Sequence, residues 1–340
     1  MSTPTPDAEH RKLTPEEKLK ARCYDLIYLM TERLLIPFLG AGVNLTNCPE
    51  KSPEEEEVFD PDGPYLPTGK QLSKSIALAC KYPWRDKSLL RVSWYASYAM
   101  NDEGVVYGRD RLYKHLHRIF TRDRDLTDVH NFLASLPKRL AEKGYPNRHQ
   151  IIVTTNYDDQ LERAFYDKGE PYDIISYVER RGTEIPGFRL TPHDGPPRFV
   201  SNDDYVTAPL NRTLILKIHG AVDRKYWQRS SFVITEDDYI DYVAFRIPDQ
   251  IPATLVDEIQ SRRFLFLGYS LSDWNLRVLL RSIKVRSPFK EPTLAVMNSH
   301  EEWDPMYWKR HGVLLEKCPL KEYMATLNEQ LDDFPNGPGE

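Results

Sequence analysis

Short apolar runs alternate along the chain with stretches whose apolar residues recur every three or four positions. Four runs, within residues 34–44, 150–159, 213–220 and 264–270, end in glycine or polar residues. Continuous apolar runs of this length are typical of buried strands in a parallel sheet. Further strands are predicted at residues 173–178, 230–235, 293–297 and 313–317. Together the pattern predicts an α/β fold, although Pro37 is unusual inside a central strand.

Helical spacing dominates the segments between these runs. Thr14, Pro15 and Glu17 form a capping signature for the first helix. Residues 71–121 repeat only at helical intervals, which predicts a mainly helical module over 71–145 inserted into the α/β domain. Its aromatic residues fit either a hydrophobic core or the wall of a cofactor site. The other predicted helices are 129–143 interrupted near Pro137 and followed by Gly144, 160–168, one capped by Thr235, 252–262, 276–283 and 320–331.

The organisation that follows has three parts. Residues 1–13 are polar and predicted to be a flexible arm, residues 14–334 form the domain, and residues 335–340 are a tail. Proline-rich and glycine-rich connections are expected at 46–69 and 182–206.

Composition narrows the possible functions. The 340 residues carry a net charge of −5, so no overall field would attract nucleic acid or an anionic membrane. The four cysteines are far apart and form no C-x-x-C pair, which argues against a zinc site or a disulfide framework. Since neither a targeting signal nor a membrane-length apolar segment is evident, we expect a cytoplasmic protein.

Polar groups at the ends of the apolar runs are the candidate chemistry. In an open parallel sheet, ligands bind beyond the carboxyl ends of the strands. Gly40 and Gly42 would allow close approach of a diphosphate, while Asn156 and Asp158 follow the second run and His219 follows the third. Each has a simpler role as well: tight turns need glycine, Asn and Asp cap helices, and a single histidine is commonly a satisfied polar residue.

These four strand ends, which carry GAG, TTNYD, KIHG and GYSLSD, resemble the sirtuin-like (silent information regulator two) family from about residue 34 to 297. The resemblance implies a Rossmann-like parallel sheet, helices on both faces, and NAD bound across the strand ends. By this resemblance Asn156 and His219 are the catalytic residues, His219 as the histidine of the family's His-Gly motif. The residues expected to bind NAD are Gly40, Ala41, Gly42, Asn44, Thr155, Asp158, Gly268, Ser270 and Asp273.

Two departures distinguish the chain from the protein deacylases of that family. The Gly-Ile-Pro-Asp-Phe-Arg segment after the glycine turn is replaced by residues 43–49, and no cysteine occurs between Cys80 and Cys318 to form the zinc module. The pattern is more similar to the NADase domains of bacterial antiphage systems, which cleave NAD to nicotinamide and ADP-ribose. We therefore expect an NAD+ hydrolase with no metal, in which Asn156 orients the ribose or a water. With an ordinary pKa near 6.5, His219 would accept a proton.

Two alternatives remain open on the sequence: an NAD-dependent protein deacylase, and a non-catalytic regulatory subunit that binds NAD or ADP-ribose. The chain ends soon after the domain, so we expect a homo-oligomer regulated by a separate protein. In one family of this kind the partner is a HerA-like hexameric ATPase. Neither membrane association nor direct nucleic-acid binding is expected.

Overall fold

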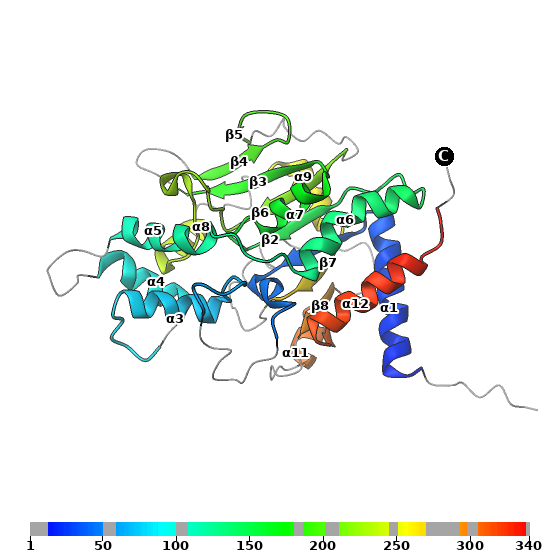
Figure 1. The fold of residues 1–340 in the computed structure, drawn as a ribbon, viewed down its shortest axis with the longest axis horizontal. Coiled ribbons are helices and arrows are strands. Elements are labelled where there is room, and N and C mark those ends of the chain that lie inside the picture. Colours follow the sequence, from blue (N-terminus) through cyan, green and yellow to red (C-terminus); the bar gives the residue numbers. More distant parts are fainter. Residues whose placement is uncertain are drawn as a thin grey trace, which may run out of the picture.

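The protein is an α/β structure built on one large, mostly parallel sheet (Figure 1). This computed structural model describes residues 13–49, 59–86, 88–99, 108–179, 186–200, 211–244, 251–269, 293–297 and 305–337. Within them the strands are β1 (Leu35–Leu39), β2 (Ile151–Thr154), β3 (Tyr172–Val178), β4 (Gly187–Thr191), β5 (Arg198–Phe199), β6 (Thr213–Lys217), β7 (Arg263–Leu267), β8 (Thr293–Met297) and β9 (Val313–Lys317).

The helices of the described residues surround this sheet. They are α1 (Pro15–Thr31), α3 (Gly69–Ala79), α4 (Leu89–Tyr98), α5 (Arg109–Phe120), α6 (Asp128–Glu142), α7 (Gln160–Lys168), α8 (Glu236–Ala244), α9 (Ala253–Gln260), α11 (Pro305–Arg310) and α12 (Leu320–Asp333), with short 3-10 helices η1 (Ala41–Leu45) and η2 (Trp227–Arg229). None of the helices in the described ranges combines the length and apolar character needed to cross a bilayer.

The strand order is β5-β4-β3-β6-β2-β1-β7-β8-β9. The seven strands β3-β6-β2-β1-β7-β8-β9 are all paired in parallel. Strands β4 and β5 extend the sheet beyond β3 with antiparallel pairing. From β1 the chain adds β2 on one side and then β3, β4 and β5 farther out, and it returns to place β6 between β3 and β2. Only then does it cross to β7 on the other side of β1. The carboxyl end of β1 therefore lies at a topological switch point, where ligands bind in such sheets.

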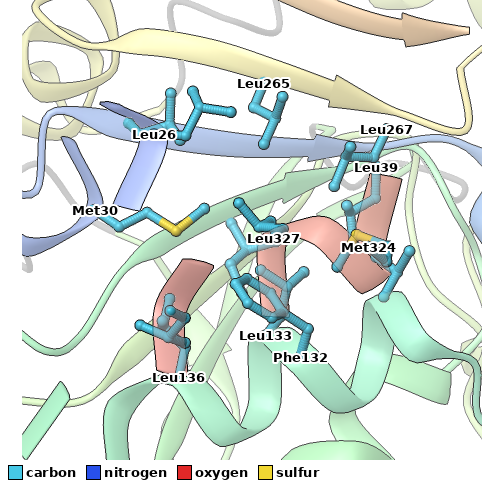
Figure 2. Packing of buried hydrophobic residues seen from close by; sticks show 14 of the residues in the cluster. Leu26, Met30, Leu39, Phe132, Leu133, Leu136, Leu265, Leu267, Met324 and Leu327 are labelled. Carbon is cyan, nitrogen blue, oxygen red and sulfur yellow. The ribbon is translucent and has the colours of Figure 1, made fainter. Parts of the chain in front are cut away.

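Alternate residues of the central strands face two separate cores. Figure 2 shows one of them, in which Leu39 and Leu265 of the sheet meet Met30 of α1, Phe132 of α6 and Met324 of α12. The other face packs against α8, α9 and α11. The predicted α/β fold with helices on both faces is thus confirmed.

The helical module is also confirmed as part of the fold. Helices α3, α4 and α5 lie together at one end of the molecule beside α8 (Figure 1), and they share a third core with Tyr157 and Phe232. The division of the chain into arm, domain and tail stays a prediction.

Pro37 is accommodated because of where its missing N–H would point. On the β7 side, the Leu34 carbonyl accepts from Arg263 N–H and Gly40 N–H donates to the Leu267 carbonyl. On the β2 side, the Leu39 carbonyl accepts from Thr155 N–H. Alternation therefore directs position 37 toward β2, and β2 pairs with β1 only from Phe38 onward. A central strand tolerates proline here because the missing donor falls just before that ladder begins.

Three sequence predictions were wrong. Residues 230–235 are fully buried but form no strand, and α6 continues through Pro137 without interruption. The connection predicted over 182–206 contains β4 and the short β5, which form the antiparallel edge. The helix predicted at 276–283 lies outside the described residues.

Other local sequence predictions, on helix caps, are confirmed. The capping box of α1 is present, with Glu17 N–H donating to Thr14 Oγ1 at 3.2 Å. Thr235 caps α8 by accepting from Asp238 N–H at 3.1 Å. Gly144, after α6, has the positive φ of 80° that favours glycine.

His130 makes stability dependent on pH. It is 1% exposed, and its Nδ1 accepts from Thr127 N–H at 3.2 Å, which closes the capping box of α6. Burial lowers the pKa of His130 to about 4. Since an unfolded histidine titrates near 6.5, falling pH protonates the unfolded chain first, and stability is lost between about pH 6.5 and 4.

We predict that His130→Gln reduces this loss, because glutamine can accept the same hydrogen bond without titrating. Between pH 7 and pH 5 the variant should lose about 2 kcal/mol less unfolding free energy than the wild type, at about 1.4 kcal/mol per pKa unit. Urea unfolding at both pH values measures this. His193→Gln, at a side chain 44% exposed, is the control, and equal losses in wild type and His130→Gln would contradict the assignment.

Candidate functional site

Four adjacent strands end at one level of the sheet. The register pairs Lys217 of β6 with Thr154 of β2, Thr154 with Leu39 of β1, and Leu39 with Leu267 of β7. These four residues form a row across the sheet, and each predicted site motif begins at its row residue or at the residue directly after it. The row therefore brings together segments that are far apart in the sequence.

Asn156 and His219 occupy equivalent positions beyond this row. Each lies two residues after its member of the Thr154 and Lys217 pair, on strands that are direct neighbours. Neighbouring strands are about 4.8 Å apart. A hydrogen bond from Ile218 N–H to the Thr154 carbonyl, 3.1 Å, continues the contact past the register pair. The two predicted catalytic residues thus follow the ends of neighbouring strands.

The glycine turns after β1 and β7 pack directly on each other. Gly42 N–H donates to the Gly268 carbonyl at 2.8 Å, and a Cβ on Gly42 would lie 2.7 Å from that same oxygen. Gly40 is as tightly enclosed, since its Cβ would also lie 2.7 Å from the Gly268 oxygen. Gly268 has a φ of +61°, which favours glycine by itself. These glycines are needed for packing between the turns, and their contact with a diphosphate stays a prediction.

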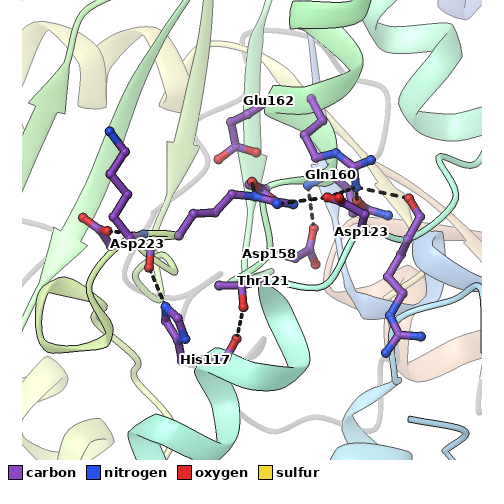
Figure 3. A network of polar contacts seen from close by, with 12 residues as sticks. His117, Thr121, Asp123, Asp158, Gln160, Glu162 and Asp223 are labelled. Atoms are coloured by element: carbon purple, nitrogen blue, oxygen red, sulfur yellow. Dashed lines mark hydrogen bonds and ion pairs between the residues drawn. The ribbon is translucent and has the colours of Figure 1, made fainter. Parts of the chain in front are cut away.

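Asn156 and Asp158 are fixed by contacts to the turn after β1. Asn156 Nδ2 donates to the Gly40 carbonyl at 3.3 Å, and Asn44 Nδ2 donates to Asp158 Oδ2 at 3.0 Å. Asp158 Oδ1 also accepts from Gln160 N–H at 3.1 Å, so the alternative role in helix capping is real (Figure 3). Both side chains are at most 9% exposed. The structure therefore joins the second motif to the first through side-chain hydrogen bonds.

His219 lies in an aromatic environment, and the contacts described for it involve tyrosine side chains. The hydroxyl of Tyr239 is 3.2 Å from Nε2 and 3.4 Å from Nδ1, and the ring of Tyr242 packs edge-on at 5.9 Å. Burial lowers the pKa of His219 to about 3. The expectation of an ordinary pKa near 6.5 was therefore wrong. A neutral imidazole at physiological pH can donate or accept a hydrogen bond but is a weak base.

A buried extended segment, residues 230–235, supports both catalytic candidates from behind. Val233 N–H donates to the His219 carbonyl at 2.9 Å, and the Val233 carbonyl accepts from the Tyr157 hydroxyl at 2.7 Å. Tyr157 immediately follows Asn156. Gly220 is pressed against Ser231, whose carbonyl oxygen would lie 2.2 Å from a Cβ at that position. One segment therefore connects the Asn156 loop with the His219 turn.

The remaining predicted residues divide into two groups. Ala41 and Thr155 lie at the same strand ends, and Thr155 N–H donates to the Leu39 carbonyl at 3.2 Å. Ser270 and Asp273 lie outside the described residues, so their predicted contacts with NAD stay predictions.

The sequence analysis missed a buried ion pair beneath the site. Lys217 Nζ lies 2.7 Å from Glu162 Oε1 of α7, and the lysine is 1% exposed. A charged residue inside an apolar strand, in the quoted KIHG motif, was the available signal. Tyr239 carried no signal of its own, because its contact with His219 depends on how α8 packs.

The next question is whether the described side chains could bind a metal ion. Among the described residues, no group of three or more His, Cys, Asp or Glu side chains is arranged to hold a metal ion. All four cysteines are free thiols, and three of them are buried.

Comparison with known proteins points to a specific kind of domain. Residues 150–315 match the family model of the SIR2-like domain. The chain is 26% identical over 134 residues to "Defense-associated sirtuin 2" of Bacillus subtilis, which is 39% of this chain and 10% of that protein.

Two further relatives carry the name "NAD(+) hydrolase ThsA". The protein of Bacillus cereus is 28% identical over 171 residues, or 50% of this chain and 27% of that protein. The protein of Enterococcus faecium is 27% identical over 194 residues, or 56% of this chain and 31% of that protein. The chain spans less than a third of the length of each of these relatives. Residues 150–315 are therefore similar to the SIR2-like domain, and part of the chain is similar to proteins named for defence and for NAD+ hydrolysis.

Proposed function

We propose that this protein hydrolyses NAD+ to nicotinamide and ADP-ribose, and that it depletes NAD+ in antiphage defence. The observation that supports the proposal is the strand register, in which Asn156 and His219 follow the ends of the neighbouring strands β2 and β6, next to the switch point at β1. The names of similar proteins, one defence-associated sirtuin and four NAD+ hydrolases, support the same reaction and role.

Cleavage of NAD+ by water needs little acid–base catalysis from the protein. The bond between C1′ of the ribose and the nicotinamide nitrogen breaks, and the bonding pair leaves with the nitrogen, which loses its positive charge. The ribose passes through an oxocarbenium-like state that a water oxygen then attacks, and one proton is released. Because nicotinamide leaves as a neutral molecule, no general acid is needed.

The two side chains suit this reaction. The carboxamide of Asn156 would orient a ribose hydroxyl or the water without adding charge. The neutral imidazole of His219 would accept a hydrogen bond from the attacking water, whose proton passes on to solvent. An imidazole with its pKa lowered to about 3 fits the orienting role better than that of a strong base.

Other residues beyond the ends of β1 and β2 would hold the dinucleotide. The turn at Gly40, Ala41 and Gly42 would lie against the diphosphate, while Asn44, Thr155 and Asp158 would face the ribose. NAD+ is the substrate in this proposal, and no resident metal takes part.

We further propose that the protein acts in the cytoplasm as a homo-oligomer under the control of a separate protein, such as a HerA-like hexameric ATPase. The support is physiological and structural: an unrestrained NADase would exhaust the NAD+ of its own cell. In addition, α1 exposes two tyrosines one turn apart, Tyr24 at 42% and Tyr28 at 54%, at the end of the molecule where α1 meets α12 (Figure 1).

We predict that Asn156→Ala and His219→Ala each lower the rate of nicotinamide release from NAD+ by at least about 10²-fold, the low end for a lost acid–base or orienting group. Chromatography of nicotinamide and ADP-ribose, without any acyl-lysine peptide present, measures the rate. His193→Ala, at an exposed histidine, should retain the wild-type rate.

The thermal midpoint of each variant separates chemistry from folding. Near wild-type turnover in a folded Asn156→Ala or His219→Ala protein would remove that residue from the site. Turnover that requires an acyl-lysine peptide and yields O-acyl-ADP-ribose would establish the deacylase instead. Binding of NAD+ without any turnover, with or without a lysate of infected cells, would establish a regulatory subunit.

Assembly is tested by light scattering combined with turnover. We expect a homo-oligomer whose activity changes when the candidate partner is added, because the regulatory proposal places control outside the catalytic fold. A monomer with full activity that no partner alters would contradict this proposal while leaving the NADase assignment intact.

A further inference from the structure

Lys217 is a fully buried lysine that the proposed reaction does not use. It is the last residue of β6, 1% exposed, and it points to the face of the sheet that α7 covers. Its ammonium lies 2.7 Å from Glu162 Oε1 and also donates a hydrogen bond to the main-chain carbonyl of Asp158. Figure 3 shows Asp158 and Glu162 near each other at the start of α7.

Stability alone is a poor reason for this arrangement. Two charges removed from water incur a desolvation penalty that their mutual attraction only partly offsets, and apolar residues of similar size are often as stable. Burial raises the pKa of Glu162, which reflects that penalty, and the nearby ammonium of Lys217 acts in the opposite direction. What an apolar pair could not provide is the hydrogen bond to the Asp158 carbonyl.

That hydrogen bond connects the two strand ends of the site. Asp158 lies two residues after Asn156, and Lys217 lies two residues before His219. The strand that presents His219 therefore holds, through one side chain, the main chain that presents Asn156. The side chain of Asp158 is held separately by Asn44 and by Gln160 N–H.

We infer that Lys217 is a positioning residue that fixes the Asn156–Asp158 loop relative to His219. The inference rests on the proposed NAD+ hydrolysis for its effect on rate. Misplacement of a reacting or orienting group by about 1 Å can lower a rate by about 10²-fold. Loss of the Lys217 hydrogen bond should therefore lower kcat, while the turn that would bind the diphosphate is untouched.

The test compares Lys217→Met with the double variant Lys217→Met/Glu162→Leu. The single variant leaves the Glu162 carboxyl buried without its partner and should have a lowered melting temperature. The double variant removes both charges and should regain the wild-type melting temperature. Its kcat should nevertheless stay at least about tenfold below wild type, with KM for NAD+ within about threefold. If the double variant regains both the wild-type melting temperature and the wild-type kcat, the role of Lys217 is structural and the inference is wrong.

Two matched variants control for charge and for the loop. Glu162→Gln keeps Lys217 and its hydrogen bond to Asp158, so kcat should stay within about threefold of wild type. Arg224→Gln breaks an exposed ion pair to Asp159, the next residue of the same loop, and should leave kcat unchanged because exposed pairs contribute little. A tenfold loss of kcat in Arg224→Gln would show that any contact to this loop matters, which would overturn the specific role of Lys217.

Hydrogen–deuterium exchange tests the inference without enzyme activity. In the double variant, amides of residues 155–159 should exchange at least about tenfold faster than in wild type, while β2 and β6 stay protected. Unchanged exchange at the loop would overturn the inference even if NAD+ hydrolysis is established. Faster exchange in a protein that does not cleave NAD+ would instead support the positioning role and refute the proposed function. If the double variant does not fold, Lys217→Gln/Glu162→Gln replaces it, because glutamine is too short to reach the Asp158 carbonyl.

Discussion

The close packing of the two glycine turns after β1 and β7 is the constraint on which the candidate site depends. At Gly40 and at Gly42 a Cβ atom would lie 2.7 Å from the carbonyl oxygen of Gly268. Backbone cannot move away from such a contact as the end of a flexible side chain can. Any side chain there would separate the ends of β1 and β7, which pair over the full length of β1. The close approach of the two turns at the switch point therefore depends on three residues that lack a side chain.

Close packing at this edge also determines its electrostatics. The loops after β1, β2, β6 and β7 cover one another, so polar groups such as Asp158, Lys217 and His219 are nearly removed from water. Each is stabilised by specific neighbours rather than by solvent, as Asp158 is by Asn44. Groups held in this way are already oriented before a substrate binds, and such preorganisation is a main source of electrostatic catalysis.

The central sheet could be predicted from sequence because its information is local. A buried parallel strand must be apolar on both faces, so β1, β2, β6 and β7 appear as continuous apolar runs. Residues 230–235 are equally buried but form no ladder. Ser231 N–H donates to the Ala221 carbonyl and Val233 N–H to the His219 carbonyl, while the Ser231 hydroxyl accepts from Glu179 N–H. Apolar character alone cannot distinguish a strand from an extended segment buried between loops. Strand β4 was missed for a different reason: only its alternate residues Phe188 and Leu190 are buried, so no continuous apolar run marks it.

The positions of Asn156 and His219 at neighbouring strand ends could be predicted from the sequence, but the surroundings and the pKa of His219 could not. Because parallel strands end at one edge, Asn156 and His219 could be expected together, and the register of Thr154 with Lys217 agrees with this. No local pattern indicates that the segment 230–235, Tyr239 and Tyr242 would enclose His219 and lower its pKa, since these contacts join residues distant in sequence.

That lowered pKa in turn limits the chemistry available to the site. A carboxamide and a neutral imidazole can orient a nucleophile, but neither is a strong base or acid at pH 7. Cleavage of a bond whose leaving group would depart as a strongly basic anion, such as an alkoxide or an amide anion, would require a proton donor here. Nicotinamide in NAD+ already carries the positive charge that a general acid would otherwise supply. A site with these two groups is therefore better matched to the N-glycosidic bond of NAD+ than to an ordinary ester, amide or glycoside.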